Sequence, residues 1–265
     1  MDPVLTVLHF GGTERTLGTF GLLVGLGILV SSLLGTRAAA RAGLDPGLTI
    51  ASFGFTAAGS IAGAYGLFVV VELFRTGHLL DFANEGGLVF YGAPIGGGLA
   101  LYLSCRGFGL PFLRLCDAAV HAIPAGHAIG RLGCFFGGCC FGSEIPATHD
   151  APFWAVRYTN LLAPAAHPPV LRHPTPLYES ALLLLVAWAL TTIPTRRVGD
   201  GSRLGLYCVI YAAVRTTVEL YRGDLVRGVW ALGLSTSQWL SLLTAGLGFV
   251  LLARARHVFP RGATA

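Results

Sequence analysis

Long windows without charge are the feature that most restricts how this chain folds. A helix needs about 20 apolar residues to cross the hydrocarbon of a bilayer. Uncharged apolar windows of about this length cover residues 17–35, 46–71, 86–105, 180–195 and 229–253. Two further apolar segments, 113–140 and 204–221, carry a few charged side chains. The pattern predicts an all-α integral membrane protein with about seven transmembrane helices.

The overall composition supports the membrane class. Of the 265 residues, 54% are hydrophobic and only 12% are charged, whereas about a quarter of a soluble domain is charged. So few charges cannot cover a globular surface in water, and lipid removes the need for them. We find no linker, repeat or low-complexity tract, so we expect one membrane domain over residues 1–265. The acidic N-terminus lacks the basic region of a cleaved signal peptide.

The basic residues, all arginines, set the expected orientation. Ten of the 18 arginines follow alternate spans, at Arg37 and Arg41, Arg106 and Arg114, Arg196, Arg197 and Arg203, and Arg254, Arg256 and Arg261. The positive-inside rule makes these loops cytoplasmic, with the N-terminus outside and the C-terminus inside. Since these arginines also account for the sequence pI of about 9.1, we do not expect a nucleic-acid partner.

Two features stand apart from plain lipid-facing helices. The largest segment outside the membrane is predicted at about residues 143–172, on the external side, with a strand-like run at 153–158. Glycines are dense at 86–98 and 130–142. Small residues allow helices to pack closely in membranes, and irregular backbone at membrane depth lines a cavity or is buried in protein. The two stretches therefore indicate either tight packing or the wall of a lipid-facing pocket.

Charges inside the apolar segments indicate a site. Tyr211, Arg215, Glu219 and Arg222 follow helical spacing, so we expect them on one face of the sixth span. Arg215 and Glu219 could simply satisfy each other, but Arg131 lies in another span and also needs a partner. The planar guanidinium fork suits phosphate recognition. Two embedded arginines beside a glycine-lined wall predict a receptor for a phospholipid head group.

Five motifs in order resemble the prolipoprotein diacylglyceryl transferases of bacterial inner membranes. They are the glycine-flanked motif of the third span, the Gly-Arg-x-Gly segment at 130–133, HPTPLYE at 173–179, YAAVRTTVELYR at 211–222 and Gln238 at the start of the last helix. No single motif is specific, but the order and predicted membrane depth of all five are. The resemblance covers most of the chain.

The resemblance implies a seven-helix enzyme of the inner membrane with an external head. Such an enzyme transfers the diacylglyceryl group of phosphatidylglycerol to the cysteine sulfur of a prolipoprotein signal peptide, and glycerol phosphate leaves. No cofactor and no metal is implied. The implied partners are phosphatidylglycerol, prolipoprotein signal peptides and membrane lipid.

The chain departs from the family pattern on the side of the acceptor thiol. Tyr91-Gly92-Ala93 stands where the family has His-Gly-Gly, and Phe20 stands where it has tyrosine. Cys134 and Gly137 replace asparagines, and Cys139 replaces a glutamate. The retained residues are Arg131, Tyr211, Arg215, Glu219, Arg222 and Gly142. We therefore expect a divergent member whose phosphate-holding part is intact and whose thiol-activating part is rebuilt.

These matches give each candidate residue a role. Arg131 and Arg215 are the expected catalytic cations for the departing phosphate. Tyr91 is the positional candidate for the thiol proton, although a phenol is a poor base at neutral pH unless a nearby arginine favours its ionised form. Otherwise Tyr91 hydrogen-bonds the lipid, and water or lipid phosphate takes the proton. Substrate binding is expected from Arg131, Tyr211, Glu219, Arg222, Gly92, Gly142, Cys134 and Cys139.

The cysteines leave several alternatives open. Cys105, Cys116 and Cys208 are expected to be apolar fillers. Cys134, Cys139 and Cys140 could pack, form a disulfide in an oxidising compartment, or include a thiol that carries the lipid. A metal site with His121, His127 or His149 is disfavoured, because zinc sites usually show two spaced ligand pairs.

The HPTPLYE motif predicts a helix start. Thr175 and Pro176 suit the N-cap and N1 positions, which would place Tyr178 and Glu179 at the outer membrane interface. His173 is expected to cap the loop before it.

Two other classes compete with the transferase. One is a non-enzymatic membrane protein that binds anionic lipid through the arginine pocket. The other is a membrane thiol oxidoreductase built on the Cys134 cluster, which lacks a C-x-x-C pair.

Overall fold

The chain forms a helical bundle with small β-structure at one end. The computed structural model describes residues 4–10, 13–78, 89, 91–146, 151–158, 170–193, 201–222 and 233–258. Its helices are α1 (Thr19–Arg41), α2 (Pro46–Thr76), α3 (Gly92–Phe108), α4 (Phe112–Ala119), α5 (Ala122–Phe136), α6 (Thr175–Thr192), α7 (Ser202–Glu219) and α8 (Thr236–Val258). Its strands are β1 (Val4–Phe10), β2 (Thr13–Gly18), β3 (Val156–Arg157) and β4 (Leu171–Arg172).

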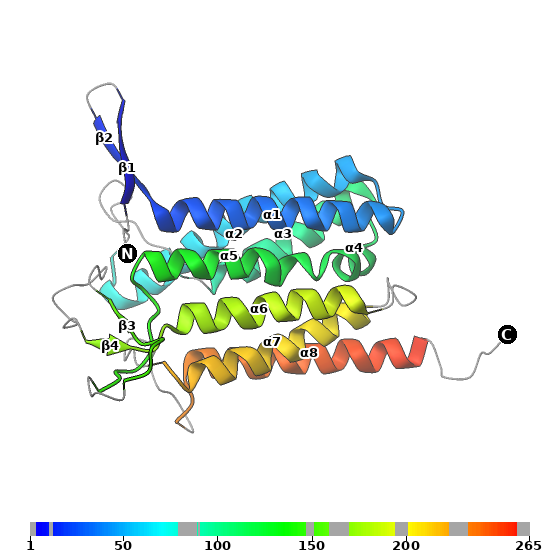
Figure 1. Ribbon diagram of the computed structural model, residues 1–265. Coiled ribbons are helices and arrows are strands. Elements are labelled where there is room, and N and C mark those ends of the chain that lie inside the picture. Colours follow the sequence, from blue (N-terminus) through cyan, green and yellow to red (C-terminus); the bar gives the residue numbers. More distant parts are fainter. Residues whose placement is uncertain are drawn as a thin grey trace.

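The two antiparallel hairpins lie at the same end of the bundle. β1 pairs with β2, and β3 pairs with β4, and Figure 1 shows both pairs at the left, opposite α4 and the C-terminal end of α8. The β1–β2 hairpin was not predicted from the sequence. The β3–β4 pair lies in the predicted head segment and includes part of the strand-like run at 153–158. Residues 147–150 and 159–169 of that segment lie outside the described residues.

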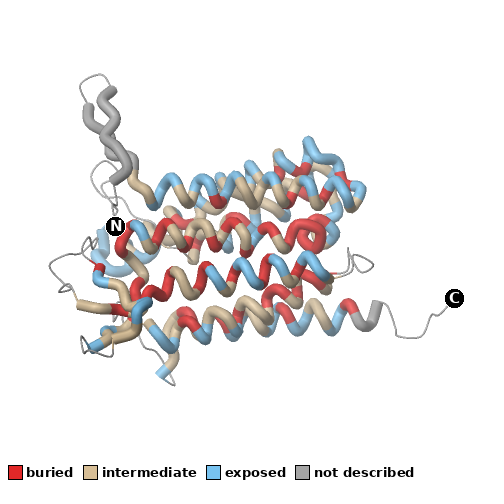
Figure 2. Tube along the Cα trace, viewed as in Figure 1, coloured by how far each residue is buried: buried red, intermediate tan, exposed pale blue. Residues whose placement is uncertain are grey.

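The helices have the composition of a membrane bundle. Four of them are long and apolar enough to cross a bilayer: α1, α2, α6 and residues 236–255 of α8. Large apolar side chains face outward, including Ile61, Leu103 and Trp188 at 57–68% exposure. Figure 2 shows few buried residues along α1, whereas buried residues are concentrated along α5 and α6. An all-α protein with an apolar exterior was predicted; the count of seven spans is not established by these lengths.

The expected fourth span, 113–140, is divided into α4 and α5. The break falls at Val120 and His121. Asp117, which is fully buried in α4, accepts hydrogen bonds from the backbone nitrogens of Gly201 and Leu204, both at 2.9 Å. It thereby satisfies free donors at the first turn of α7. A carboxylate near a helix N-terminus is also favoured by the helix dipole, so the charge in this segment fixes α4 against α7.

Arginines predicted to share one side of the membrane share one end of the bundle. Arg41 from the end of α1, Arg114 from α4 and Arg203 from the start of α7 line a common pocket of about 550 Å³. They come from three of the four predicted basic loops. Their clustering agrees with the predicted alternation of the loops.

Glycine stretches serve helix packing at several points. A Cβ on Gly92 would lie 2.1 Å from the carbonyl oxygen of Gly63, and one on Gly96 would lie 2.3 Å from that of Gly59. These contacts join α3 to α2. Likewise, a Cβ on Gly126 of α5 would lie 2.4 Å from the carbonyl oxygen of Gly27 in α1. Close packing therefore explains Gly92 and Gly96 without a ligand.

The α2–α3 contact yields a matched test. Gly96→Ala places a methyl group against the α2 backbone, so we expect a loss of about 1–3 kcal/mol from overpacking. Gly98→Ala is the control, because no atom lies within 4 Å of its added Cβ and alanine favours helix. Thermal unfolding in detergent should show a lower Tm for the first variant and an unchanged or higher Tm for the second. Equal Tm values would contradict the close packing.

Candidate functional site

One face of α5 carries the polar residues of the site. His127, Arg131 and Cys134 are spaced four and three residues apart, which places them on the same side of the helix. Gly126 and Gly133, on another side, contact α1 at Gly27 and Phe20. Small residues therefore seat α5 against α1 while its polar face turns toward α6 and α7. Phe20 itself is 45% exposed and contributes its backbone to this contact.

Arg131 is paired with Glu179 of α6. Its Nη2 lies 2.9 Å from Oε1 of Glu179, and the two side chains are 11% and 1% exposed. The hydroxyl of Ser180 donates to the carbonyl oxygen of Ala128 at 2.9 Å and fixes the two helices beside this pair. Nε of Arg131 is buried and has no hydrogen-bond partner among the described residues. Arg131 is therefore held in place with a donor to spare.

The prediction for the start of α6 was wrong about the capping residue. Pro174, not Thr175, is the N-cap, and the Thr175 hydroxyl instead donates to the carbonyl oxygen of Cys140 at 2.6 Å. Glu179 of the same motif is fully buried within the bundle. The reason is Arg131: a charge buried in an apolar bundle requires a partner of opposite sign.

Arg215 of α7 has a similar arrangement. Its Nη2 lies 2.9 Å from Oε2 of Glu219 and donates to the Ser237 hydroxyl of α8 at 2.9 Å. The pair expected from helical spacing is thus formed, and Ser237 ties it to a second helix. Nη1 of Arg215 is buried without a hydrogen-bond partner in the described part of the chain. Mutual satisfaction of Arg215 and Glu219 therefore leaves part of the guanidinium available.

Tyr211 connects these groups. It lies within electrostatic range of Arg131, Arg215, Glu179 and Tyr91. Its ring is 5.8 Å from that of His127, centroid to centroid. Tyr91 immediately precedes α3 and is half-buried. The structure therefore brings together four of the predicted residues, Tyr91, Arg131, Tyr211 and Arg215, and adds His127 and Glu179.

Arg222 and Gly142 lie at a separate point. Helix α7 ends at Glu219, so Arg222 does not continue its polar face as predicted; it forms an antiparallel bridge with Gly142. A Cβ on Gly142 would lie 2.5 Å from the carbonyl oxygen of Tyr221, so this crossing of strands requires glycine. Arg222 remains within electrostatic range of the thiol of Cys140 and the hydroxyl of Tyr158. Burial raises the pKa of Tyr158 well above its ordinary value.

The cysteine cluster lies beside Arg131. Nη1 of Arg131 is 4.0 Å from Sγ of Cys134. The sulfur atoms of Cys134, Cys139 and Cys140 all lie within 4.8 Å of one another, and all three thiols are free. Histidines are absent from the group of ligand atoms found among the described residues; His149 lies outside them. The other cysteines, Cys105, Cys116 and Cys208, are buried, as expected of apolar fillers.

Three contributing residues were missed by the sequence reasoning. Glu179 stands in a motif that we had noted, and the need of Arg131 for a counter-charge was the available signal. Ser237 and His127 gave no such signal, because a lone serine or histidine fits many roles.

Gln238 of the last motif has a structural role, since it forms a capping box with Ser235. Its Oε1 accepts a hydrogen bond from the Ser235 backbone nitrogen at 2.8 Å, and its backbone nitrogen donates to the Ser235 hydroxyl at 3.3 Å.

Comparison with known proteins decides the family. The family model for prolipoprotein diacylglyceryl transferase matches residues 7–254. The chain therefore belongs to the prolipoprotein diacylglyceryl transferase family. Three relatives are each named phosphatidylglycerol–prolipoprotein diacylglyceryl transferase. The Clostridium tetani protein is 33% identical over 94% of this chain and 95% of its own length. The Idiomarina loihiensis protein is 34% identical over 75% of this chain and 71% of its own length. The Methylobacillus flagellatus protein is 30% identical over 96% of this chain and 97% of its own length.

The Arg131–Glu179 pair yields a second prediction. Glu179→Gln leaves a buried arginine without its counter-charge, which typically costs about 3–5 kcal/mol. Glu72→Gln is the matched control: it breaks the pair with Arg75, but the Arg75 side chain is 70% exposed and stays in contact with solvent, so only a small loss of stability is expected. Unfolding of both variants in detergent measures the difference. A Glu179→Gln protein as stable as the control would show that Arg131 does not depend on this partner.

Proposed function

We propose that this chain transfers the diacylglyceryl group of phosphatidylglycerol to the cysteine thiol of a prolipoprotein signal peptide. Its relatives carry the name of this reaction. The observation that supports it in this chain is the pair of largely buried arginines, Arg131 and Arg215. Both lie within electrostatic range of Tyr211, and each keeps a donor without a hydrogen-bond partner among the described residues. Guanidinium donors in an apolar bundle suit an anionic head group.

The two arginines act on the leaving group. The acceptor sulfur attacks the glyceryl carbon that bears the phosphate, a thioether forms, and glycerol phosphate departs with the electrons of the broken carbon–oxygen bond. Negative charge grows on the phosphate during this step. Donors that Glu179, Glu219 and Ser237 hold in place stabilise that charge without reorganisation. Tyr211 and Tyr91 lie at the same site and hydrogen-bond the lipid, or Tyr91 takes the thiol proton.

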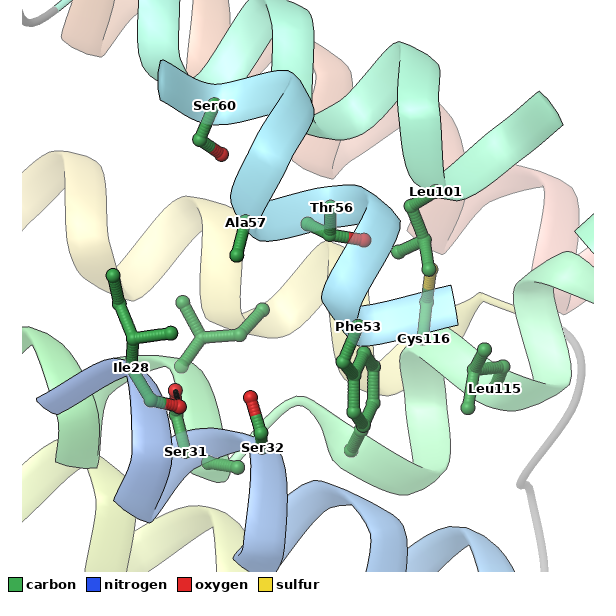
Figure 3. A pocket seen from close by; sticks show the side chains of 13 residues that line it. Ile28, Ser31, Ser32, Phe53, Thr56, Ala57, Ser60, Leu101, Leu115 and Cys116 are labelled. Atoms are coloured by element: carbon green, nitrogen blue, oxygen red, sulfur yellow. Dashed lines mark hydrogen bonds between the residues drawn. The ribbon is translucent and has the colours of Figure 1, made fainter. Parts of the chain in front are cut away.

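An apolar pocket offers room for an acyl chain. It measures about 230 Å³ and lies between α1, α2 and the α4–α5 segment. Figure 3 shows Ile28, Ser31 and Ser32 of α1 facing Phe53 and Thr56 of α2 across it. The hydroxyls of Ser31 and Thr56 donate to their own helix backbone, so the walls are effectively apolar. Its lining residue Ile123 lies about 12 Å along α5 from Arg131, within reach of a chain whose phosphate Arg131 binds.

The proposed membrane arrangement follows from the same features. We place the chain in the bacterial inner membrane as one domain with seven passes, in which α4 and α5 together make the fourth. The end with Arg41, Arg114 and Arg203 faces the cytoplasm under the positive-inside rule. The end with both hairpins, including the head at about 143–172, faces outward, with the N-terminus outside and the C-terminus inside.

Reporter fusions test this orientation. A reporter fused after Arg203 is expected to read as cytoplasmic, because the positive-inside rule retains basic loops there. A reporter inserted near Thr148 is expected to read as external. Activity of paired cytoplasmic and periplasmic reporters in whole cells provides the measurement. The reverse pattern at both positions would place the head on the wrong side for a lipoprotein substrate.

Arginine variants test the phosphate site. Arg131→Ala and Arg215→Ala should each remove about 3–5 kcal/mol of transition-state stabilisation, a loss of about 10²- to 10⁴-fold in rate. Arg215→Lys should recover only part, because an ammonium cannot reproduce the two-pronged contact. Transfer of labelled diacylglyceryl to a lipobox peptide is the assay, and Arg106→Ala, exposed at the end of α3, is the control.

Near-normal transfer by either alanine variant, with Arg106→Ala unimpaired, would remove the arginines from the mechanism. If the parent protein binds phosphatidylglycerol vesicles but transfers nothing to any lipobox peptide, the chain is a lipid-binding protein and the proposed reaction is wrong.

Tyr91 is tested by two substitutions. If its hydroxyl takes part in transfer, Tyr91→Phe should lose most activity, by about 10²-fold for a general base, and Tyr91→His should keep or raise it. If Tyr91 only shapes the pocket, Phe is tolerated and His is neutral or harmful. The lipobox assay over a range of pH, with folding checked by thermal unfolding, separates the two roles.

A further inference from the structure

Three thiols converge where α5 ends. Cys134 closes the polar face of α5, and Cys139 and Cys140 stand in the turn that follows it. Their sulfur atoms all lie within 4.8 Å of one another, although Cys134 is buried and the other two are half-buried. Cysteines that only fill apolar space do not need to bring three partly accessible sulfur atoms together.

The backbone of Cys140 is strained in the position that completes the cluster. Its φ is 62°, and it is the only residue other than glycine with a positive φ in the described part of the chain. Left-handed backbone costs such a residue about 1–2 kcal/mol. The Thr175 hydroxyl holds the Cys140 carbonyl at 2.6 Å from a neighbouring segment. Strain of this kind persists where surrounding contacts enforce it and is frequent at functional sites.

The dimensions and the charge suit one zinc ion. Zinc binds thiolate at about 2.3 Å, which separates the sulfurs of a tetrahedral site by about 3.8 Å. The three sulfurs would need to draw together by about 1 Å at most. Three thiolates and one Zn²⁺ carry a net charge of −1, which Arg131 and Arg222, both within electrostatic range of Cys140, complement. A disulfide would use two sulfurs and leave the third without a role.

We propose that Cys134, Cys139 and Cys140 bind one zinc ion as thiolates and leave its fourth position open to the thiol of the acceptor cysteine. Three protein ligands with an open fourth position are the usual composition of a catalytic zinc site. The metal site stands independently, whereas the use of its fourth position rests on the transferase activity proposed above.

The open position supplies a means of activating the acceptor that does not depend on Tyr91. A thiol that coordinates zinc is deprotonated, and its proton passes to water. The bound sulfur then attacks the glyceryl carbon, the carbon–oxygen bond to phosphate breaks, and glycerol phosphate leaves with the electron pair. The product thioether carries no charge and is a weaker ligand than thiolate, so it dissociates from the metal. No oxidant or reductant is required.

Metal content tests the site first. Full-length protein purified in detergent should contain one zinc per chain, with about three sulfurs at about 2.3 Å by X-ray absorption. Cobalt in its place should give tetrahedral visible bands and a thiolate charge-transfer band. Cys134→Ala, Cys139→Ala and Cys140→Ala should each lose the metal, and Cys208→Ala, a buried cysteine of α7 outside the cluster, should keep it.

Because a cluster variant could fail to fold, the deciding measurement is metal binding by the parent protein. A parent chain that binds neither zinc nor cobalt after reduction overturns the proposal. So does a disulfide within the cluster when thiols are trapped in intact cells.

The acceptor step is tested with peptide. Adding a lipobox peptide should shift the cobalt spectrum, and the same peptide with serine for cysteine should not. Removing the metal should lower transfer by about 10²-fold or more, and zinc should restore it. No spectral shift, or full transfer by metal-free protein, overturns the acceptor role while leaving the transferase function intact. Zinc binding without any transfer would instead refute the function and leave the metal site standing.

Discussion

The buried ion pair between Arg131 and Glu179 is the constraint on which the arrangement of the site depends. An arginine in an apolar bundle is costly unless a partner neutralises it, and here the partner comes from another helix, at 2.9 Å. That contact fixes α5 against α6 in one register. The hydrogen bond from Ser180, the next residue of α6, to the carbonyl oxygen of Ala128 holds the same register. Glycines on the other side of α5 let it approach α1 closely enough for the polar face to stay inside.

Pairing each arginine with a carboxylate changes how the site can hold an anion. Arg131 with Glu179 and Arg215 with Glu219 are two neutral units, so the bundle does not carry two bare positive charges when no lipid is bound. In the proposed function, specificity for phosphate would then rest on the donors that remain, Nε of Arg131 and Nη1 of Arg215. Such donors are oriented before the substrate arrives, and orientation fixed in advance is what makes electrostatic stabilisation of a transition state effective.

The sequence identified the embedded charges but not all of their partners. Uncharged windows predicted the helical membrane class, and Arg131 and Arg215 stood out because charge is rare in such windows. Glu179 was not recognised as the partner of Arg131, because the order of a motif does not reveal which side chain of another helix its residues face. Arg222 continued the helical spacing on paper, but α7 ends at Glu219, where the chain turns to pair with Gly142. The break between α4 and α5 is not visible in spacing alone, since it depends on contacts between distant segments, whereas the three cysteines lie within residues 134–140 and were already grouped from the sequence.

The two halves of the proposed chemistry meet at Arg131. Displacement at a saturated carbon requires the attacking sulfur and the departing oxygen on opposite sides of that carbon, a few ångström apart. Arg131 reaches Glu179 with Nη2 and lies 4.0 Å from Cys134 Sγ with Nη1, so one guanidinium spans the arginine site and the cysteine cluster. Cysteines in place of the family's asparagine and glutamate, near the position expected for the acceptor thiol, can therefore alter how that thiol is activated. The contacts of Arg131 with Glu179 and of Arg215 with Ser237 remain unchanged. This separation explains how a chain can retain the residues expected to bind phosphate and still differ from its family at the residues expected to act on the thiol.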